Sequence, residues 1–163
     1  MSIAGRSGLC LADLVRSPAW LATFPSGEAA ISPIEGSSEG TIVVDRGIDS
    51  MGLLSEPIKV TVRKRRVVSV SGGTQAKHLE NLTHSGVYAS NIAEFTIGTN
   101  PLSRMLGNIT EDKILKGYAH ITIEDNHTIG GETESCIHLD MVILKLTVWL
   151  DGTKMVDEGV LTL

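Results

Sequence analysis

The stretch Cys136-Ile137-His138-Leu139-Asp140 organises the chain, and it lies between the loop Gly130-Gly131-Glu132 and the largely apolar residues 141–146. Side chains two apart on a β-strand leave the same face, so a strand here directs His138 and Asp140 toward one point. An imidazole and a carboxylate that meet in this way form half of a metal site. The alternative for the pair alone is a buried histidine followed by an aspartate at the end of a strand.

The pattern of the remaining chain predicts many strands and few helices. Strands are expected where residues alternate at period two or are rich in β-branched types, namely 2–6, 41–45, 58–62, 67–71, 92–97, 118–123 and a terminal hairpin over 146–156 around Asp151-Gly152. One main helix is expected over residues 75–82 with Thr74 as its N-cap, and shorter helical turns at 10–15, 18–24 and 111–116. The predicted fold class is α+β, with a curved, mostly antiparallel sheet or barrel-like domain.

The bulk composition indicates one soluble domain over residues 1–163. The chain is 42% hydrophobic and 20% charged, has a net charge of -5 and is only 4% aromatic, so neither nucleic acid nor an anionic membrane is an expected partner. The one basic run, residues 63–66, is predicted to be the solvated end of a hairpin. No apolar stretch approaches the ~20 residues that span a bilayer. The N-terminus lacks the apolar core of a signal peptide, and the two cysteines fit no metal or disulfide spacing, so a cytoplasmic location is expected.

Three further residues offer metal-ligand chemistry on separate segments. In residues 92–97 the alternation places Ile92, Glu94 and Thr96 opposite a face of apolar side chains. His120 likewise lies opposite the apolar face of residues 118–123, and Glu28 follows a Pro/Gly turn at residues 24–28. Together with His138 and Asp140 these side chains form a mixed nitrogen and oxygen set that suits Zn, Co, Mn or Fe(II) better than Ca or Mg.

Each candidate also has a structural alternative. Glu94 can pair with a basic residue at the rim of the sheet, His120 can be a hydrogen-bonded core histidine, and Glu28 can cap its turn. His78 and His84 are expected to be solvated rather than functional.

The order of these motifs resembles the metallopeptidase family of aminopeptidase T and aminopeptidase S, in particular its leucyl-aminopeptidase-like branch. The resemblance runs nearly end to end, and the segments that carry it are 24–28, 32–37, 40–45, 91–101, 117–120, 125–126, 130–131 and 137–140. It implies an exopeptidase that removes N-terminal residues from peptides by means of two divalent ions, Zn or Co, with Mn or Fe as alternatives.

The resemblance also assigns roles to residues. Matched by motif, the metal ligands are Glu28, Glu94, His120, His138 and Asp140, and Glu28 shuttles the proton of the attacking water. Family members carry a tyrosine seven residues after the histidine of the Gly-x-x-His motif. This chain has His127 there, which is expected to stabilise an oxyanion or donate a proton. The family's N-terminal α/β domain has no counterpart in the chain, and its dimer contact implies a homo-oligomer.

Two other functions are compatible with the same residues. The superfamily also resembles ring-cleaving Fe(II) dioxygenases acting on dihydroxypyridines, for which His-x-Asp and one further ligand supply a facial triad. A non-catalytic oligomeric remnant of the domain is the third alternative. One Fe(II) per chain favours the dioxygenase, and two Zn or Co ions favour the peptidase.

Overall fold

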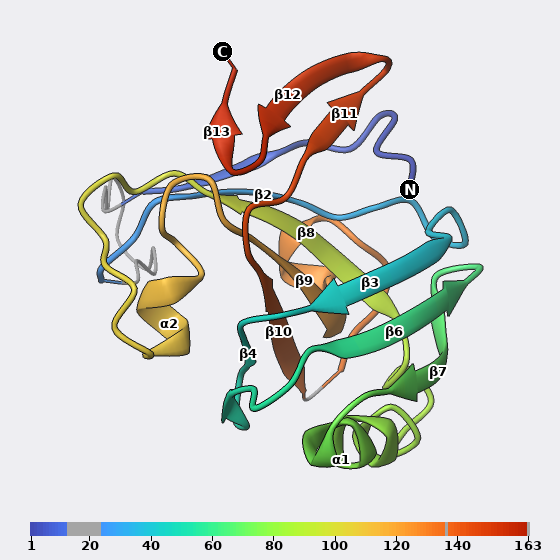
Figure 1. Cartoon of the computed structure of the whole chain (residues 1–163). Helices are drawn as coiled ribbons and strands as arrows, with labels where there is room; N and C mark the ends of the chain where they lie inside the picture. Colours follow the sequence, from blue (N-terminus) through green and yellow to red (C-terminus); the bar gives the residue numbers. More distant parts are fainter. Residues whose placement is uncertain (13–23, 136, 163) are drawn as a thin grey trace.

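A computed structural model describes residues 1–12, 24–135 and 137–162. Its largest element is an antiparallel sheet of seven strands, in the order β1-β2-β8-β9-β10-β4-β5 (Figure 1). The strands of this sheet are β1 (Leu9–Leu11), β2 (Glu28–Ile31), β8 (Ile92–Gly98), β9 (Ala119–Glu124), β10 (His138–Ile143), β4 (Gly47–Ile48) and β5 (Gly52–Leu53). The sheet is open, with β1 and β5 as its edges, and it does not close into a barrel within the described residues. The predicted α+β class with a mostly antiparallel sheet is confirmed.

The core lies between this sheet and a second one of three strands. The second sheet consists of β3 (Gly40–Val44), β6 (Ile58–Arg63) and β7 (Arg66–Ser71), and the main helix α1 (Thr74–Leu82) follows it. Apolar side chains of both sheets and of α1 form one buried cluster, which includes Val60, Leu79, Ile123, Leu139 and Met141. Burying such side chains stabilises each by roughly 1.5–3 kcal/mol, so this cluster fixes the two sheets against each other.

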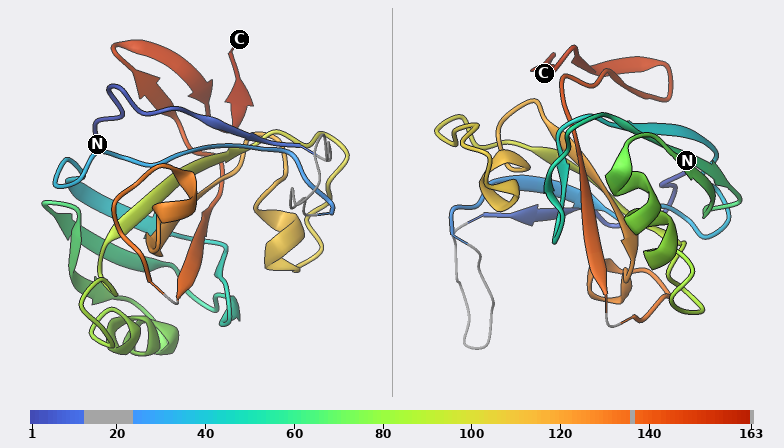
Figure 2. Two further views of the ribbon diagram at one scale, coloured as in Figure 1. Left: turned by 180° about the vertical axis from the view of Figure 1, so that it is seen from behind. Right: turned by 60° about the horizontal axis from the view of Figure 1, so that its bottom comes forward.

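A third sheet projects from the rest of the molecule, at the top of Figure 1 and in both views of Figure 2. It consists of β11 (Val148–Leu150), β12 (Thr153–Asp157) and β13 (Val160–Leu161). The predicted Asp-Gly turn is confirmed: Asp151 and Gly152 both have positive φ, at 47° and 81°, as a tight two-residue hairpin requires. The other helical elements are α2 (Ile109–Asp112) and the 3₁₀ turn η1 (His127–Ile129). None of the described helices is long and apolar enough to cross a membrane.

The N-terminal segment differs from the prediction. Residues 2–6 form a turn rather than a strand, since the Arg6 N–H donates to the Ile3 carbonyl. Residues 10 and 11 belong to strand β1, where Cys10 pairs with Ala29, and not to a helix. Pairing with the edge of β2 therefore outweighs the weak helical pattern of residues 10 and 11. The helical turns expected within residues 13–23 lie outside the described residues. Cys10 is a free, exposed thiol, and Cys136 is also outside the described part.

Two helix starts also differ by a residue or two. Helix α1 begins at Thr74 itself, with Gly73 as the N-cap and no side-chain capping bond, so Thr74 is not the cap. Helix α2 starts at Ile109, earlier than the predicted turn, because the side chain of Asn108 accepts from the Thr110 N–H and caps it.

A β-bulge changes one of the predicted strand faces. The register between β8 and β9 shifts between Ile92 and Glu94, so Ile92 pairs with Ile123 while Glu94 pairs with Thr122. Because the extra residue Ala93 reverses the alternation, Ile92 lies on the core face and not beside Glu94. The bulge leaves Glu94 and Thr96 on the opposite face, as predicted.

The basic run at the end of the β6–β7 hairpin is only partly solvated. Arg65 is 5% exposed, and its guanidinium donates to the Ile92 carbonyl at 2.9 Å and to Thr133 Oγ1 at 2.7 Å. It also lies 3.3 Å from a carboxylate oxygen of Glu35. The expectation of a fully solvated hairpin end is wrong for Arg65, because the hairpin end folds back onto the loop that follows β9.

Gly98 gives a test of how tightly this sheet is packed near Glu28. A Cβ added at Gly98 would lie 2.3 Å from the Leu115 carbonyl oxygen and 2.6 Å from the Ile114 carbonyl carbon, both of which are backbone atoms that cannot swing away. We expect Gly98→Ala to lower the free energy of unfolding by about 1–3 kcal/mol in urea denaturation. Gly86→Ala is the matched control, since nothing lies within 4 Å of its added Cβ. Equal stabilities of the two variants would contradict the packing.

Candidate metal centre

Four neighbouring strands bring the predicted polar residues onto one face of the large sheet (Figure 1). The register pairs Thr96 with His120, and Glu94 with Thr122. Thr122 in turn pairs with Asp140 across β9 and β10. On the other side Ala30 pairs with Thr96, so Glu28, two residues away on β2, shares the face. The period-two alternation of four separate strands therefore assembles one polar cluster inside the protein.

His120 lies at the centre of this cluster and is 2% exposed. Its Nε2 is 3.8 Å from Glu94 Oε1 and 3.8 Å from Asp140 Oδ1, and its Nδ1 is 3.8 Å from Glu28 Oε1. Burial lowers the pKa of His120 to about 4, so its ring is neutral near pH 7. These contacts are therefore not ion pairs, and the neutral imidazole is the form that binds metals.

Asp140 is the most heavily contacted carboxylate of the cluster and is fully buried. Its Oδ1 accepts from Thr122 Oγ1 at 2.5 Å and lies 3.2 Å from His138 Nε2, while its Oδ2 pairs with the Lys113 ammonium. Burial works to raise the pKa of Asp140, but the hydrogen bond from His138 and the charge of Lys113 oppose it, and the pKa lies well below its usual range. Asp140 therefore remains a carboxylate in the folded protein.

Two buried polar atoms of the cluster have no hydrogen-bond partner among the described residues. They are Glu28 Oε1 and His120 Nδ1, which lie 3.8 Å apart. Buried polar atoms are nearly always paired, so two such neighbouring atoms indicate a site for a further hydrogen-bonding group or a cation. Burial, with a smaller contribution from the carboxylates of Asp140 and Glu94, raises the pKa of Glu28 to about 7 against the opposing effect of Lys113. Burial also raises the pKa of Glu94.

The raised pKa of Glu28 predicts a pH dependence of stability in the metal-free protein. Its folded pKa of about 7 exceeds the value of 4.5 that a solvated glutamate has, so its stabilising contribution is present below about pH 4.5 and is lost as the pH rises through 7. The glutamine of Glu28→Gln cannot ionise. The free energy of unfolding of this variant should therefore increase relative to that of the wild type by roughly 3 kcal/mol between about pH 5 and about pH 8. Urea unfolding of both proteins in EDTA measures the difference, and parallel pH profiles would contradict it.

A cavity of about 360 Å³ opens onto the cluster. Glu28, Glu94, His120, His138 and Lys113 are among its polar lining residues. Apolar side chains also line it, from Leu9, Leu11, Ala12, Pro25, Ile114 and Ile129. A cavity lined by apolar side chains and a few converging polar groups is typical of a small-molecule site.

The structure brings five of the six predicted site residues together. Glu28, Glu94, His120 and Asp140 are buried in the cluster, and the half-exposed His138 joins it through Asp140. His127 does not join: it is exposed in η1, and the cavity is lined instead by its neighbours Thr128 and Ile129. His78 and His84 are exposed, as predicted.

Sequence reasoning missed three residues of the site. Thr122 had a signal, because it lies two residues after His120 on the same face of β9. Lys113 had none, because it follows the short helix α2, far from the motifs in the sequence. Asp49 follows β4, and its backbone N–H donates to the Asp140 carbonyl at 3.0 Å. Burial and the Asp140 carboxylate raise the pKa of Asp49 to about 6.

The donor set fits a divalent cation. Ligand atoms of one ion, each at about 2.0–2.2 Å from it, lie roughly 3–4 Å apart. Glu94 Oε1 and Asp140 Oδ1 both lie at such a distance from His120 Nε2. His138 is within the same range of Asp140. As the side chains stand, no group of three or more His, Cys, Asp or Glu within the described ranges forms a ready coordination shell. Completing one requires small side-chain movements, and Lys113 already contacts Asp140.

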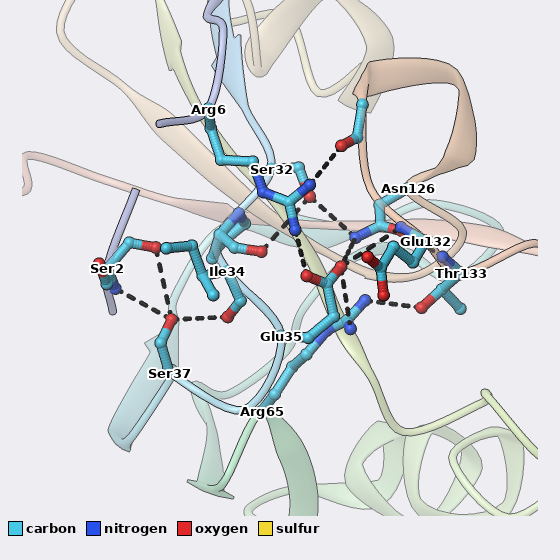
Figure 3. Close-up of polar contacts among 12 residues, drawn as sticks. Ser2, Arg6, Ser32, Ile34, Glu35, Ser37, Arg65, Asn126, Glu132 and Thr133 are labelled. Atoms are coloured by element: carbon cyan, nitrogen blue, oxygen red, sulfur yellow. Dashed lines mark hydrogen bonds and ion pairs between the residues drawn. The ribbon is translucent and has the colours of Figure 1, made fainter. Parts of the chain in front are cut away.

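A second polar cluster holds the loop that covers the cavity (Figure 3). Glu35 forms ion pairs with Arg6 and Arg65. Its Oε1 also accepts from Asn126 Nδ2 at 3.4 Å and from the Glu132 N–H at 3.3 Å. Arg6 additionally donates to the Gly130 carbonyl. These contacts tie both ends of the loop carrying Thr128 and Ile129 to the body of the protein.

The comparisons with known proteins place the chain in a superfamily. The sequence model of the NicX family, 2,5-dihydroxypyridine 5,6-dioxygenase, matches residues 6–163. Among solved structures, the chain is similar to 2,5-dihydroxypyridine dioxygenase from Pseudomonas putida KT2440, with a TM-score of 0.78 and 22% identity over 86% of this chain and 45% of that one. It is also similar to wild-type AmpT from Thermus thermophilus, with a TM-score of 0.69 and 16% identity over 87% of this chain and 41% of that one. No curated protein matches the chain significantly.

At these identities the two solved structures show the shared fold alone, and the chain spans less than half the length of either. The family match agrees with the dioxygenase alternative that the sequence motifs left open, whereas the assignment to the aminopeptidase T family is not confirmed. The family match covers nearly the whole chain, including every residue of the polar cluster. The chain belongs to the NicX, 2,5-dihydroxypyridine 5,6-dioxygenase, family.

Proposed function

We propose that the chain carries the metal-binding part of a ring-cleaving dioxygenase site for a dihydroxypyridine. The observation that carries the proposal is the family match over residues 6–163, which includes the whole cluster around His120. The Nε2 side of His120, the adjacent Asp140 and the neighbouring His138 supply two imidazoles and a carboxylate. That donor set is the one on which non-haem Fe(II) oxygenases rely.

The residues of the chain have distinct parts in this proposal. His120, His138 and Asp140, with Glu94 beside them, would hold one Fe(II), which supplies the activation of O₂ that no side chain provides. The apolar lining of the cavity packs against the aromatic ring and excludes water. Glu28 lines the same cavity with an unpartnered carboxylate oxygen, and a pKa of about 7 suits it to accept a hydroxyl proton of the ring. Both atoms of O₂ enter the product as one ring carbon–carbon bond breaks, so no separate reductant is consumed.

Oxygen uptake tests this proposal. Protein loaded anaerobically with Fe(II) is mixed with 2,5-dihydroxypyridine and air-saturated buffer, and we expect one O₂ consumed per ring cleaved, with loss of the aromatic absorbance. Glu28→Gln should retain iron but lower the rate by about 100-fold or more, the usual contribution of a general base. The absence of both ring binding and oxygen uptake in the iron-loaded protein would refute the proposal.

A second candidate is an aminopeptidase-like hydrolase with two ions. One feature favours it. The Glu28 carboxylate lies on the Nδ1 side of His120, whereas Glu94 and Asp140 lie on the Nε2 side, so the imidazole has carboxylates on both sides. Carboxylates in excess allow two ions to be bound. Two Zn or Co ions per chain with release of N-terminal residues from peptides would favour this candidate over the dioxygenase.

A further inference from the structure

Lys113 is a cation placed among the proposed metal ligands. Its Nζ pairs with Asp140 Oδ2, and its side chain is 18% exposed and lines the cavity. The pairing of Nζ with a buried carboxylate is an ion pair, and a lysine amine is ordinarily protonated near pH 7. Lys113 therefore remains an ammonium, and its positive charge lies where a metal ion would place its own.

Three side chains engage the carboxylate of Asp140 in this arrangement: Thr122 and His138 at Oδ1, and Lys113 at Oδ2. They occupy three of its roughly four lone-pair positions. Thr122 is fully buried within the sheet and cannot leave. Lys113, in contrast, ends a flexible four-carbon side chain that reaches in from the end of α2 and borders open space in the cavity. Of the two partners of Asp140 that are not themselves proposed metal ligands, Lys113 is the one that can move.

An ammonium and a divalent cation that share one carboxylate repel each other. Between like charges a few ångströms apart at an intermediate dielectric, this repulsion alters affinity by about tenfold or more. Binding of the metal ion to Asp140 therefore favours displacement of the ammonium, and binding of the ammonium disfavours the metal ion. A displaced Lys113 remains tethered beside the cavity, where Glu28, Asp49 or an anionic group of a bound molecule can compensate its charge.

We propose that Lys113 occupies Asp140 in place of the metal ion, and that metal binding releases its ammonium into the cavity to bind an anionic oxygen of the ring substrate. The proposal rests on the metal site of the proposed function. It makes Lys113 a substrate-binding residue that is available only when the metal is present. The empty centre is thereby kept charge-balanced, and substrate is not held without the metal.

Paired affinity measurements test this proposal. Zn²⁺, which is redox-inert, is titrated into the metal-free wild type, Lys113→Met and Lys113→Arg, and 2,5-dihydroxypyridine is then titrated into each Zn²⁺-loaded protein. Lys113→Met removes the charge but keeps the length of the side chain, so it should bind Zn²⁺ at least about tenfold more tightly and the ring compound about tenfold more weakly. Lys113→Arg retains the charge and should bind Zn²⁺ as the wild type does.

The opposite signs of these two changes are diagnostic. A purely structural lysine would leave both affinities unchanged or weaken both, and either result would overturn the proposal while leaving the metal site intact. Failure of all three proteins to bind any metal would instead refute the proposed function, and the role of Lys113 with it.

Chemical labelling of the wild-type protein gives a test that needs no variant. Reductive methylation followed by peptide mass spectrometry measures the reactivity of Lys113, with the exposed Lys116 on the same segment as internal control. Zn²⁺ should increase the labelling of Lys113 several-fold and leave Lys116 unchanged. Equal labelling of Lys113 with and without Zn²⁺ would overturn the displacement.

Discussion

Replacing Asp140 with asparagine is expected to lower the affinity for Fe(II) by at least about 100-fold, since even residues that only support a ligand typically contribute 10- to 100-fold. Asp140 lies beside both histidines of the cluster, at 3.8 Å from His120 Nε2 and 3.2 Å from His138 Nε2. The asparagine side chain keeps the shape but has no negative charge with which to hold a cation. Titration of the metal-free proteins with Fe(II) under anaerobic conditions measures the change.

Asp112→Asn is the matched control for this substitution. Asp112 is also fully buried and also pairs with a basic residue, Arg46, at 2.6 Å, but it is not among the residues that line the cavity. We expect Asp112→Asn to lower stability and to leave the affinity for Fe(II) within about twofold, far below the effect at a ligand. Equal losses of affinity in the two variants would mean that Asp140 acts through general stability and not as a ligand.

Replacing Glu35 with alanine is expected to lower the free energy of unfolding by about 3 kcal/mol, because it removes the carboxylate that forms an ion pair with the buried Arg65. The side chain of Arg65 is 6% exposed and that of Glu35 is 28% exposed, so little solvent is available to compensate. The loop that Glu35 holds also carries Thr128 and Ile129 into the cavity wall. The same variant should therefore weaken binding of a ring compound more than binding of the metal.

Glu39→Ala provides the comparison, measured by urea denaturation beside Glu35→Ala. Glu39 contacts Arg63 at 3.5 Å, with both side chains largely exposed, and such surface pairs contribute under about 1 kcal/mol. A loss at Glu35 no larger than that at Glu39 would show that Arg65 is not dependent on its carboxylate partner.

Strand alternation made most of the metal centre predictable. Glu94, His120 and the His138–Asp140 pair each lie opposite apolar neighbours, and a buried sheet places such residues on one face irrespective of the order of the strands. The Pro/Gly turn offered Glu28 as a fifth candidate, and the resemblance to the metallopeptidase family assigned it as a ligand. The family match favours the dioxygenase alternative over the aminopeptidase.

The remaining features depend on contacts between distant segments. The bulge at Ala93 is set by the pairing of β8 with β9, so strict alternation misplaces Ile92. Arg65 is buried because a loop some 68 residues away supplies Thr133, which no local pattern reveals. Lys113 enters the centre from the end of α2, where its sequence neighbours indicate only a helical turn.

The number and kind of metal ions per chain tests the central claim most directly. Protein reconstituted anaerobically with Fe(II), and in separate samples with Zn(II) or Co(II), is desalted and its metal content is measured, with Asp140→Asn and Asp112→Asn beside the wild type. A single iron per chain, retained in Asp112→Asn and lost in Asp140→Asn, is the predicted result. Two Zn or Co ions per chain would contradict the dioxygenase assignment, and no bound metal in any of the three proteins would contradict the metal centre itself.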